Sequence, residues 1–234
     1  MKYKRQYKQH NYDAADYYRE ALKRDPDDIR CNTAMARYCF KNGRFLECIS
    51  YADAAAKRLT DRNQHPADTE AFYLKGLALI YTGRLDEAYE TLYKAGWDYS
   101  YRSGAYFALA QIDCSKKRYD DALGNLDESM SCNKGHTRAM NLKSAIYRTL
   151  GENEKARECA KEVLAIDPLN LFARVELSHF EDNKDEIRAM FDHKSENFID
   201  VAAAYIKGGL YEDAVYALEI SSNEYPLYDY YKAY

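Results

Sequence analysis

Residues 69–100 read TEAFYLKGLALIYTGRLDEAYETLYKAGWDYS and contain two apolar patterns of helical period, one on either side of a glycine. In the first half, Phe72, Gly76 and Leu79 are three or four residues apart, so they share one face of a helix. Gly83 follows this run, where glycine commonly ends a helix because it has no Cβ to oppose a left-handed backbone. The apolar spacing then resumes in LDEAYETLYKA. The stretch therefore predicts two short antiparallel helices joined by a tight turn.

The same pattern recurs with a period of 34 residues across residues 67–168. Ala88, Ala122 and Ala156 occupy one equivalent position, and small residues there let paired helices approach closely. One such pair cannot bury its apolar face alone, so successive pairs are expected to stack. In such a stack each pair contacts only its neighbours.

The framework of this unit resembles that of the tetratricopeptide repeat family. The residues that carry the resemblance are Phe72, Gly76, Leu79, Gly83, Leu85, Ala88, Leu92 and Ala95. The likeness extends over nearly the whole chain and implies an all-α fold, a right-handed superhelical solenoid of antiparallel helix pairs with about six to seven repeats. It implies one solenoid domain over residues 1–234. It implies a style of binding rather than a catalytic activity.

Both ends of the chain are expected to fall within a repeat. Ala14, Tyr18 and Ala21 fit the second helix of a pair that ends at Pro26. Beyond Pro226, tyrosines at 228, 231 and 234 begin another helix. Because a soluble solenoid normally ends in a polar capping helix, these ends predict a segment of a longer protein. Self-association through the open ends is the alternative.

Three irregularities are expected inside the array. Residues 171–194 are too few for a full pair, so both helices there should be short and the superhelical curvature should change. A polar insertion lies near residues 60–65. Lys117 stands where Gly83 and Gly151 stand in the neighbouring repeats, which costs about 1 kcal/mol if this lysine is left-handed.

Charge and hydropathy exclude several classes of protein. The formal net charge is −4, which argues against a dedicated nucleic-acid binder. No apolar run approaches the roughly 18 residues needed to span a bilayer, and the charged start Met1–Arg5 is followed by polar residues, so neither a membrane protein nor a secretory signal is predicted. The six cysteines show no close pairing pattern, which indicates reduced thiols in a cytoplasmic protein.

Groove residues follow from the resemblance, because the first helix of each repeat lines the concave surface in this family. The corresponding positions are Arg30, Thr33, Arg37 and Lys41 in the second repeat, Glu70, Tyr73, Leu77 and Tyr81 in the third, Phe107 and Gln111 in the fourth, and Arg138, Asn141 and Arg148 in the fifth. Their basic and aromatic groups suit a peptide with carboxylates and apolar side chains. A solvated face without a ligand is the alternative. Thr33 and Arg37 do not reproduce the lysine and asparagine with which some family members clamp a C-terminal carboxylate, so a chaperone tail is not the expected ligand.

Catalytic and metal-binding motifs are not apparent in the sequence. The five histidines form no HExxH motif, and Cys132 and His136 make a lone pair, whereas a structural zinc site needs four converging ligands. No glycine-rich phosphate loop or nucleophile elbow is present. We therefore expect no enzyme, no cofactor and no metal.

Two functions are compatible with these observations. The first is a non-catalytic interaction scaffold that binds a peptide or protein segment in its groove. The second is a spacer or oligomerisation region of a larger bacterial protein, because the repeats at both ends are interrupted. Residues 167–174 and 208–214 also resemble stretches of bacterial tetratricopeptide proteins that carry a carbohydrate-related domain.

Overall fold

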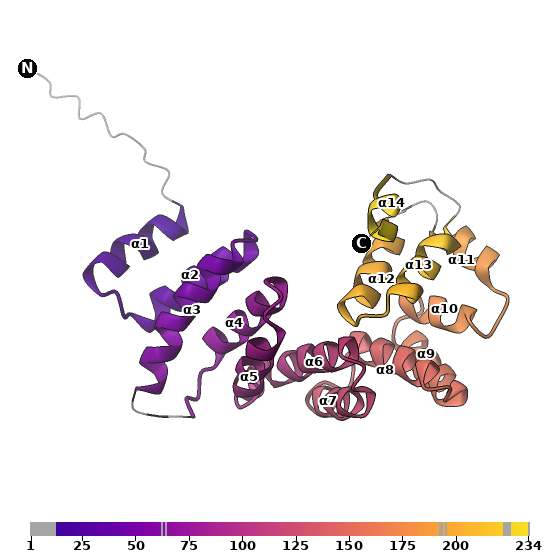
Figure 1. Cartoon of the computed structure of the whole chain (residues 1–234), viewed down its shortest axis with the longest axis horizontal. Helices are drawn as coiled ribbons and strands as arrows, with labels where there is room; N and C mark the ends of the chain where they lie inside the picture. The colour runs from indigo at the N-terminus through magenta and orange to yellow at the C-terminus, as the bar shows by residue number, and fades with distance from the viewer. Residues whose placement is uncertain are drawn as a thin grey trace, which may run out of the picture. The chain divides into compact units, whose positions relative to one another are not determined.

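The computed structural model describes residues 13–61, 63, 65–191, 194, 196–221 and 226–233, and every regular element in these ranges is an α-helix (Figure 1). The all-α arrangement of paired helices predicted from the sequence is therefore confirmed. The contacts divide the chain into two compact units, Met1–Tyr101 and Arg102–Tyr234, and each is described by itself. The single domain over residues 1–234 stays a prediction.

The first unit is a stack of antiparallel helix pairs. Its helices are α1 (Ala14–Arg24), α2 (Ile29–Lys41), α3 (Phe45–Thr60), α4 (Glu70–Tyr81), α5 (Leu85–Ala95) and the first residues of α6 (Tyr99–Ser115). α2 pairs with α3 and α4 pairs with α5, while α3 and α2 both contact α4 across the junction between pairs. α1 packs on α2 as the second helix of the incomplete pair. Part of the insertion expected at residues 60–65 lies outside the described residues.

Close approach of the paired helices depends on the small residues that the repeat places at their crossing. A Cβ added to Gly76 of α4 would lie 2.5 Å from Cγ of Leu92 on α5, and Leu92 is fully buried. Thr69, just before α4, donates its hydroxyl to the carbonyl of Ala95 at 2.8 Å in the same buried seam. The pair is therefore held at a spacing that only glycine allows on the α4 side.

The turns within the pairs share one backbone conformation. Gly43, Gly83, Gly151 and Gly209 have φ values of 70° to 78°, in the left-handed region that favours glycine. Lys117 has φ 59° at the equivalent place, so the fourth repeat keeps the same turn at the expense of an unfavourable lysine backbone. The turn positions predicted from the sequence are confirmed.

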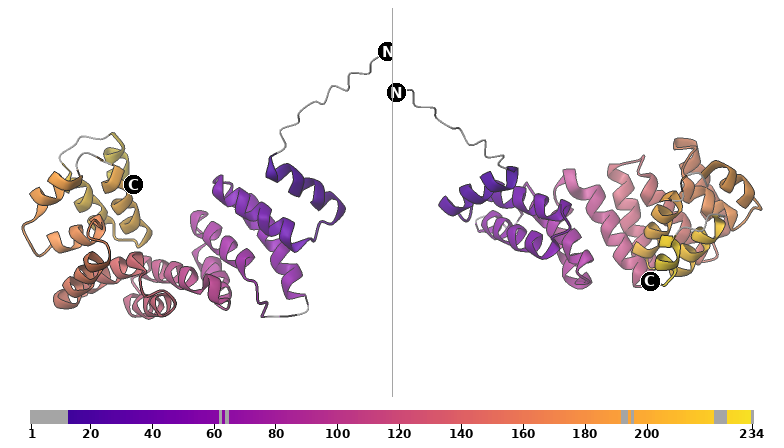
Figure 2. Two further views of the ribbon diagram at one scale, coloured as in Figure 1. Left: turned by 180° about the vertical axis from the view of Figure 1, so that it is seen from behind. Right: turned by 90° about the horizontal axis from the view of Figure 1, so that it is seen from above.

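The second unit continues the pairs and then departs from the regular pattern (Figures 1 and 2). After α6 come α7 (Tyr119–Cys132), α8 (Thr137–Thr149), α9 (Asn153–Ile166), α10 (Leu171–Ser178), α11 (Lys184–Phe191), α12 (Glu196–Lys207), α13 (Tyr211–Ile220) and α14 (Pro226–Ala233). α10 and α11 have 8 residues each, which confirms the short pair.

The α12–α13 pair contacts more than its immediate neighbours. A Cβ added to Gly209 would lie 2.8 Å from Cα of Ser115, at the end of α6, so the two turns touch backbone to backbone. Gly208 faces the side chains of Leu142 of α8 and Cys114 of α6, at 3.2 and 3.7 Å from an added Cβ. One apolar core accordingly runs from α6 through α8 and α10 to α13. The expectation that each pair contacts only its neighbours is wrong here, because the short α10–α11 pair lets the next pair reach back.

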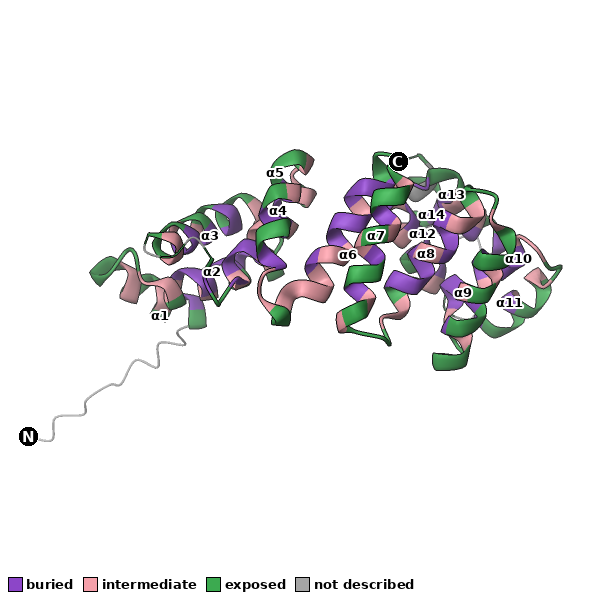
Figure 3. Cartoon of the chain, turned by 90° about the horizontal axis from the view of Figure 1, so that it is seen from below, coloured by how far each residue is buried: buried purple, intermediate pink, exposed green. Residues whose placement is uncertain are grey.

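Burial follows the facing sides of the helices (Figure 3), and it is most continuous on α10, where Leu171, Phe172, Ala173 and the run 175–178 are buried. Tyr228 of α14 is buried against α12 and α13, while Leu227 and Tyr230 are exposed; Tyr234 lies outside the described residues. None of the helices in the described ranges is long and apolar enough to cross a bilayer.

Candidate functional site

The second unit has a pocket of about 490 Å³. Its walls are α8, α12 and the loop that precedes α10. α8 contributes Arg138 and Asn141 from its N-terminal half. α12 contributes a stripe at intervals of three or four residues, from Asn197 through Asp200 and Ala204 to Lys207. The floor is apolar, formed by Leu171, Phe172, Phe191 and Val201. A concave pocket lined by both apolar and polar side chains is the candidate binding site of this unit.

Asn141 is the buried polar residue of this pocket, with 6% of its surface exposed. Asn170 caps α10 by accepting the N–H of Ala173 on its Oδ1 at 3.1 Å, which fixes which atom of that amide is oxygen. Asn141 donates its Nδ2 to the same Oδ1 at 3.0 Å. The orientation of the Asn141 amide is thereby fixed as well, and its Oδ1 is buried without a hydrogen-bond partner. A buried amide oxygen without a partner is costly, so a donor that reached this atom would be stabilising.

The charged residues of the pocket differ in how far they are engaged. Asp167 accepts the N–H of Leu169 at 3.1 Å and the side-chain amide of Asn170 at 3.3 Å, so it holds the loop together. The guanidinium of Arg138 lies over the ring of Phe107, 5.3 Å from its centroid. Asp200 is exposed on α12 and makes no ion pair or side-chain hydrogen bond with the described residues.

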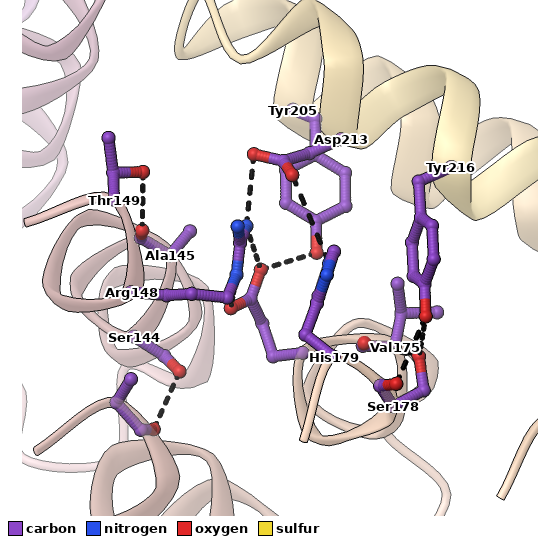
Figure 4. Close-up of polar contacts among 12 residues, drawn as sticks. Ser144, Ala145, Arg148, Thr149, Val175, Ser178, His179, Tyr205, Asp213 and Tyr216 are labelled. Atoms are coloured by element: carbon purple, nitrogen blue, oxygen red, sulfur yellow. Dashed lines mark hydrogen bonds and ion pairs between the residues drawn. The ribbon is translucent and has the colours of Figure 1, made fainter. Parts of the chain in front are cut away.

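The C-terminal half of α8 presents Arg148 on the same stripe as Arg138 and Asn141, but here the helix face is covered. Arg148 donates Nε to Glu176 Oε2 at 2.9 Å and Nη2 to Glu176 Oε1 at 3.1 Å (Figure 4). Its Nη2 also lies 2.9 Å from Asp213 Oδ2 of α13. Tyr205 of α12 donates its hydroxyl to Glu176 Oε1 at 2.6 Å. These groups join α8, α10, α12 and α13 in one polar cluster.

Burial sets the electrostatics of this cluster. The Glu176 side chain is fully buried, and burial raises its pKa although Arg148 and Tyr205 oppose the shift. Burial acts to lower the pKa of Arg148, but its bonds to Glu176 and Asp213 outweigh this and raise it. Burial also lowers the pKa of His179 to about 4, helped by Arg148 and opposed by Asp213. Arg148 therefore compensates two carboxylates, and the neighbouring imidazole is neutral at ordinary pH.

In the first unit, several of the predicted groove residues contact other residues of the same unit. Arg37 of α2 donates Nε and Nη2 to the two carboxylate oxygens of Glu70 on α4, at 2.6 and 2.7 Å. The Tyr73 and Tyr101 rings are 5.4 Å apart beside this pair, and burial together with Glu70 raises the pKa of Tyr101 to about 12. Tyr81 stacks on Phe45 with centroids 4.5 Å apart.

The polar groups of the described residues do not form a metal site, since no three His, Cys, Asp or Glu side chains converge within those ranges. Ser129, Ser103 and His136 lie together, with Ser129 Oγ 3.0 Å from His136 Nδ1. The Ser129 hydroxyl is buried and donates to the carbonyl of Ser103 at 2.8 Å, so the cluster joins helices and presents no nucleophile.

Comparison with known proteins agrees with this geometry. The sequence model described as tetratricopeptide repeat matches residues 69–95 and 137–168, which are the α4–α5 and α8–α9 pairs. These two helix pairs match the tetratricopeptide repeat.

Solved structures of tetratricopeptide repeat proteins have the same fold. A protein from Parabacteroides merdae matches with a TM-score of 0.57 at 17% identity, covering 87% of this chain and 78% of that one. YrrB, described as a TPR protein with an unusual peptide-binding site, matches with a TM-score of 0.55 at 15% identity, covering 94% and 100%. MamA matches with a TM-score of 0.50 at 18% identity, covering 85% and 96%. The chain therefore has the fold of tetratricopeptide repeat proteins.

The structure brings together only some of the groove residues predicted from the tetratricopeptide pattern. Arg138 and Asn141 share the pocket, and Arg37 and Glu70 bind each other. Thr33 is buried, and Arg148 lies in the polar cluster. The remaining positions are exposed or half-buried on their helices: Arg30, Lys41, Tyr73, Leu77, Tyr81, Phe107 and Gln111.

Sequence reasoning did not find the half of the pocket that α10 and α12 supply. Asn170 carried a signal, since asparagine before an apolar run is a common helix cap. Asn197, Asp200 and Lys207 also show a helical stripe. Nothing in the sequence indicated that this stripe would face α8.

Proposed function

We propose that the chain is a non-catalytic scaffold that binds an extended segment of a partner protein on the inner face of its repeats, centred on the pocket between α8, α10 and α12. The observation that carries this proposal is the partnerless Oδ1 of Asn141 in the pocket wall. An extended peptide offers backbone N–H groups at regular intervals, and one of them would satisfy this acceptor.

The surroundings of Asn141 support a peptide over a small polar solute. The apolar floor can bury one or two side chains, while Asn170 and Asn197 can bond further backbone groups. YrrB, which shares the fold, is described as having a peptide-binding site.

Selection from a phage-displayed random peptide library against the full chain tests this proposal, with the affinity of recovered peptides measured by calorimetry. We expect affinities near micromolar, and Asn141→Leu should weaken them by about tenfold or more, since a buried hydrogen bond contributes roughly 1–3 kcal/mol. Asn153→Leu, an exposed residue at the start of α9, is the matched control and should bind as the unchanged chain does. Peptides that bind Asn141→Leu with full affinity would contradict the proposal.

The other predicted roles stay predictions. Self-association would appear in light scattering as a mass that rises with protein concentration. A spacer role in a larger bacterial protein would be supported by an open reading frame that continues into another domain.

A further inference from the structure

The polar groups of the pocket that have no partner in the described residues identify the kind of segment that would bind. Asn141 Oδ1 is a hydrogen-bond acceptor, and its orientation is fixed by Asn170. Asp200 is an acceptor with a full negative charge. Asn197 carries both a donor and an acceptor, so it sets no preference. The partnerless groups with a fixed preference are therefore acceptors, and a ligand that supplies donors would match them.

The two cationic side chains at the pocket keep their charge and their N–H groups, but each has an interaction within the chain. Arg138 lies over the ring of Phe107, and Lys207 also has an interaction of its own. Of the two aspartates, Asp167 is engaged by the loop that it closes, which leaves Asp200 as the lining carboxylate without a partner in the described residues.

The charges around Asp200 also favour a cationic ligand. Glu196 is exposed one turn before Asp200 on α12, and like charges four residues apart on a helix repel each other by a few tenths of a kcal/mol. Residues 102–234 carry 17 Lys and Arg against 23 Asp and Glu, a formal charge of −6, whereas residues 1–101 carry 17 against 15, a charge of +2. A cationic ligand would relieve the local repulsion and be attracted by the charge of the whole unit.

We propose that the pocket of the second unit takes a basic extended segment, with a lysine or arginine side chain at Asp200, an adjacent apolar side chain on Phe172, Phe191 and Val201, and a backbone N–H on Asn141 Oδ1. This inference rests on the proposed function and states the chemistry of the segment. It differs from the carboxylate-bearing peptide that the arginine-rich groove positions predicted. Two of those arginines, Arg37 and Arg148, already bind carboxylates of the chain itself.

Three pools of fluorescein-labelled, amidated nonapeptides test the inference with the full chain. The pools have a central Leu-Arg, Leu-Gln or Leu-Glu pair, and the other positions are mixtures of Ala, Ser, Val and Leu. Fluorescence anisotropy should show the Leu-Arg pool binding about tenfold more tightly than the Leu-Glu pool, with the difference shrinking between ~50 and ~300 mM NaCl.

Charge variants locate the preference. Asp200→Lys should reverse it in favour of the Leu-Glu pool, and Asp200→Asn, which keeps the size of the side chain, should abolish the advantage of Leu-Arg over Leu-Gln. Glu219→Lys, the same charge change at an exposed position of α13, should leave the preference intact.

Each outcome decides the matter. Equal binding of the three pools, or an unchanged preference in both Asp200 variants, overturns the basic-segment inference and leaves the scaffold proposal standing. Binding of none of the pools, together with failure of the library selection, overturns both.

Discussion

Arg148→Met is the substitution that most directly tests the polar cluster under α12 and α13. Arg148 is 15% exposed and compensates the charge of Glu176, whose side chain is fully buried, and of Asp213, whose side chain is 14% exposed. Methionine keeps most of the side-chain volume but leaves two carboxylates facing each other without a cation. Removing one partner of a buried ion pair costs about 3–5 kcal/mol. That is a large fraction of the roughly 5–15 kcal/mol by which a domain is stable.

The loss should depend on pH in a direction that the structure fixes. Burial already raises the pKa of Glu176, and without Arg148 it should rise further. Between the ordinary pKa of glutamate and this raised value, the native variant binds a proton that the unfolded chain does not. The free energy of unfolding of the variant therefore increases relative to the unchanged chain as the pH falls. The difference between the two proteins should be largest near pH ~7 and narrow toward pH ~5.

Urea unfolding followed by circular dichroism measures both effects. Trp97, the single tryptophan, lies in the first unit. In Arg148→Met the urea midpoint of its fluorescence transition should therefore shift less than the midpoint of the dichroism transition. Arg84→Met is the matched control, because Arg84 makes the same two-bond contact with Glu87 on an exposed surface, and it should leave the curve nearly unchanged. Arg148→Met with Glu176→Gln removes one buried charge and should recover about 1–2 kcal/mol. An Arg148→Met curve that coincides with that of Arg84→Met would refute the reasoning.

Three further substitutions test the packing, the turns and the buried imidazole. Gly76→Ala should destabilise the fold by about 1–3 kcal/mol, because the added Cβ contacts Leu92. Gly124→Ala has open space around it and should stabilise the fold by about 0.5–1 kcal/mol. The melting temperatures of the two variants should therefore shift in opposite directions. Lys117→Gly should raise the free energy of unfolding by about 1 kcal/mol and Lys117→Ala should not, because only glycine relieves the left-handed backbone. Burial lowers the pKa of His179 to about 4 in the folded chain, from about 6.5 in the unfolded chain, so protonation favours the unfolded chain as the pH falls. Between these two pH values the free energy of unfolding should fall by about 3 kcal/mol relative to that of His179→Gln, as measured by urea titration.

The fold could be predicted from the sequence because its determinants are local. The helix expected over residues 69–81 is α4, Glu70–Tyr81, and glycine marks four of the turns. The short pair followed from a count of residues, since 24 positions cannot hold two full helices. Even the Arg37–Glu70 contact carried a signal, because its partners are 33 residues apart, close to one repeat, and so lie on neighbouring first helices.

The site could not be predicted to the same extent because it depends on how later helices return to earlier ones. Arg148 falls on the groove stripe by its position in the repeat, but its partners Glu176 and Asp213 come from two later pairs. Asn141 was identified by position alone, while its importance comes from an amide oxygen left without a partner once Asn170 has fixed its orientation. A sequence pattern with a period of one repeat contains no information on such long-range contacts.

The backbone contact between Gly209 and Ser115 has a consequence for how the second unit can evolve and unfold. In an ordinary stack, repeats can be added or lost, and the end pair can peel away while the rest persists. Here the α12–α13 pair is held both by its neighbour in the stack and by the distant end of α6. An extra 34-residue repeat inserted after α9 would therefore move Gly209 away from Ser115. The second unit should accordingly melt as one block and tolerate no change in its number of pairs.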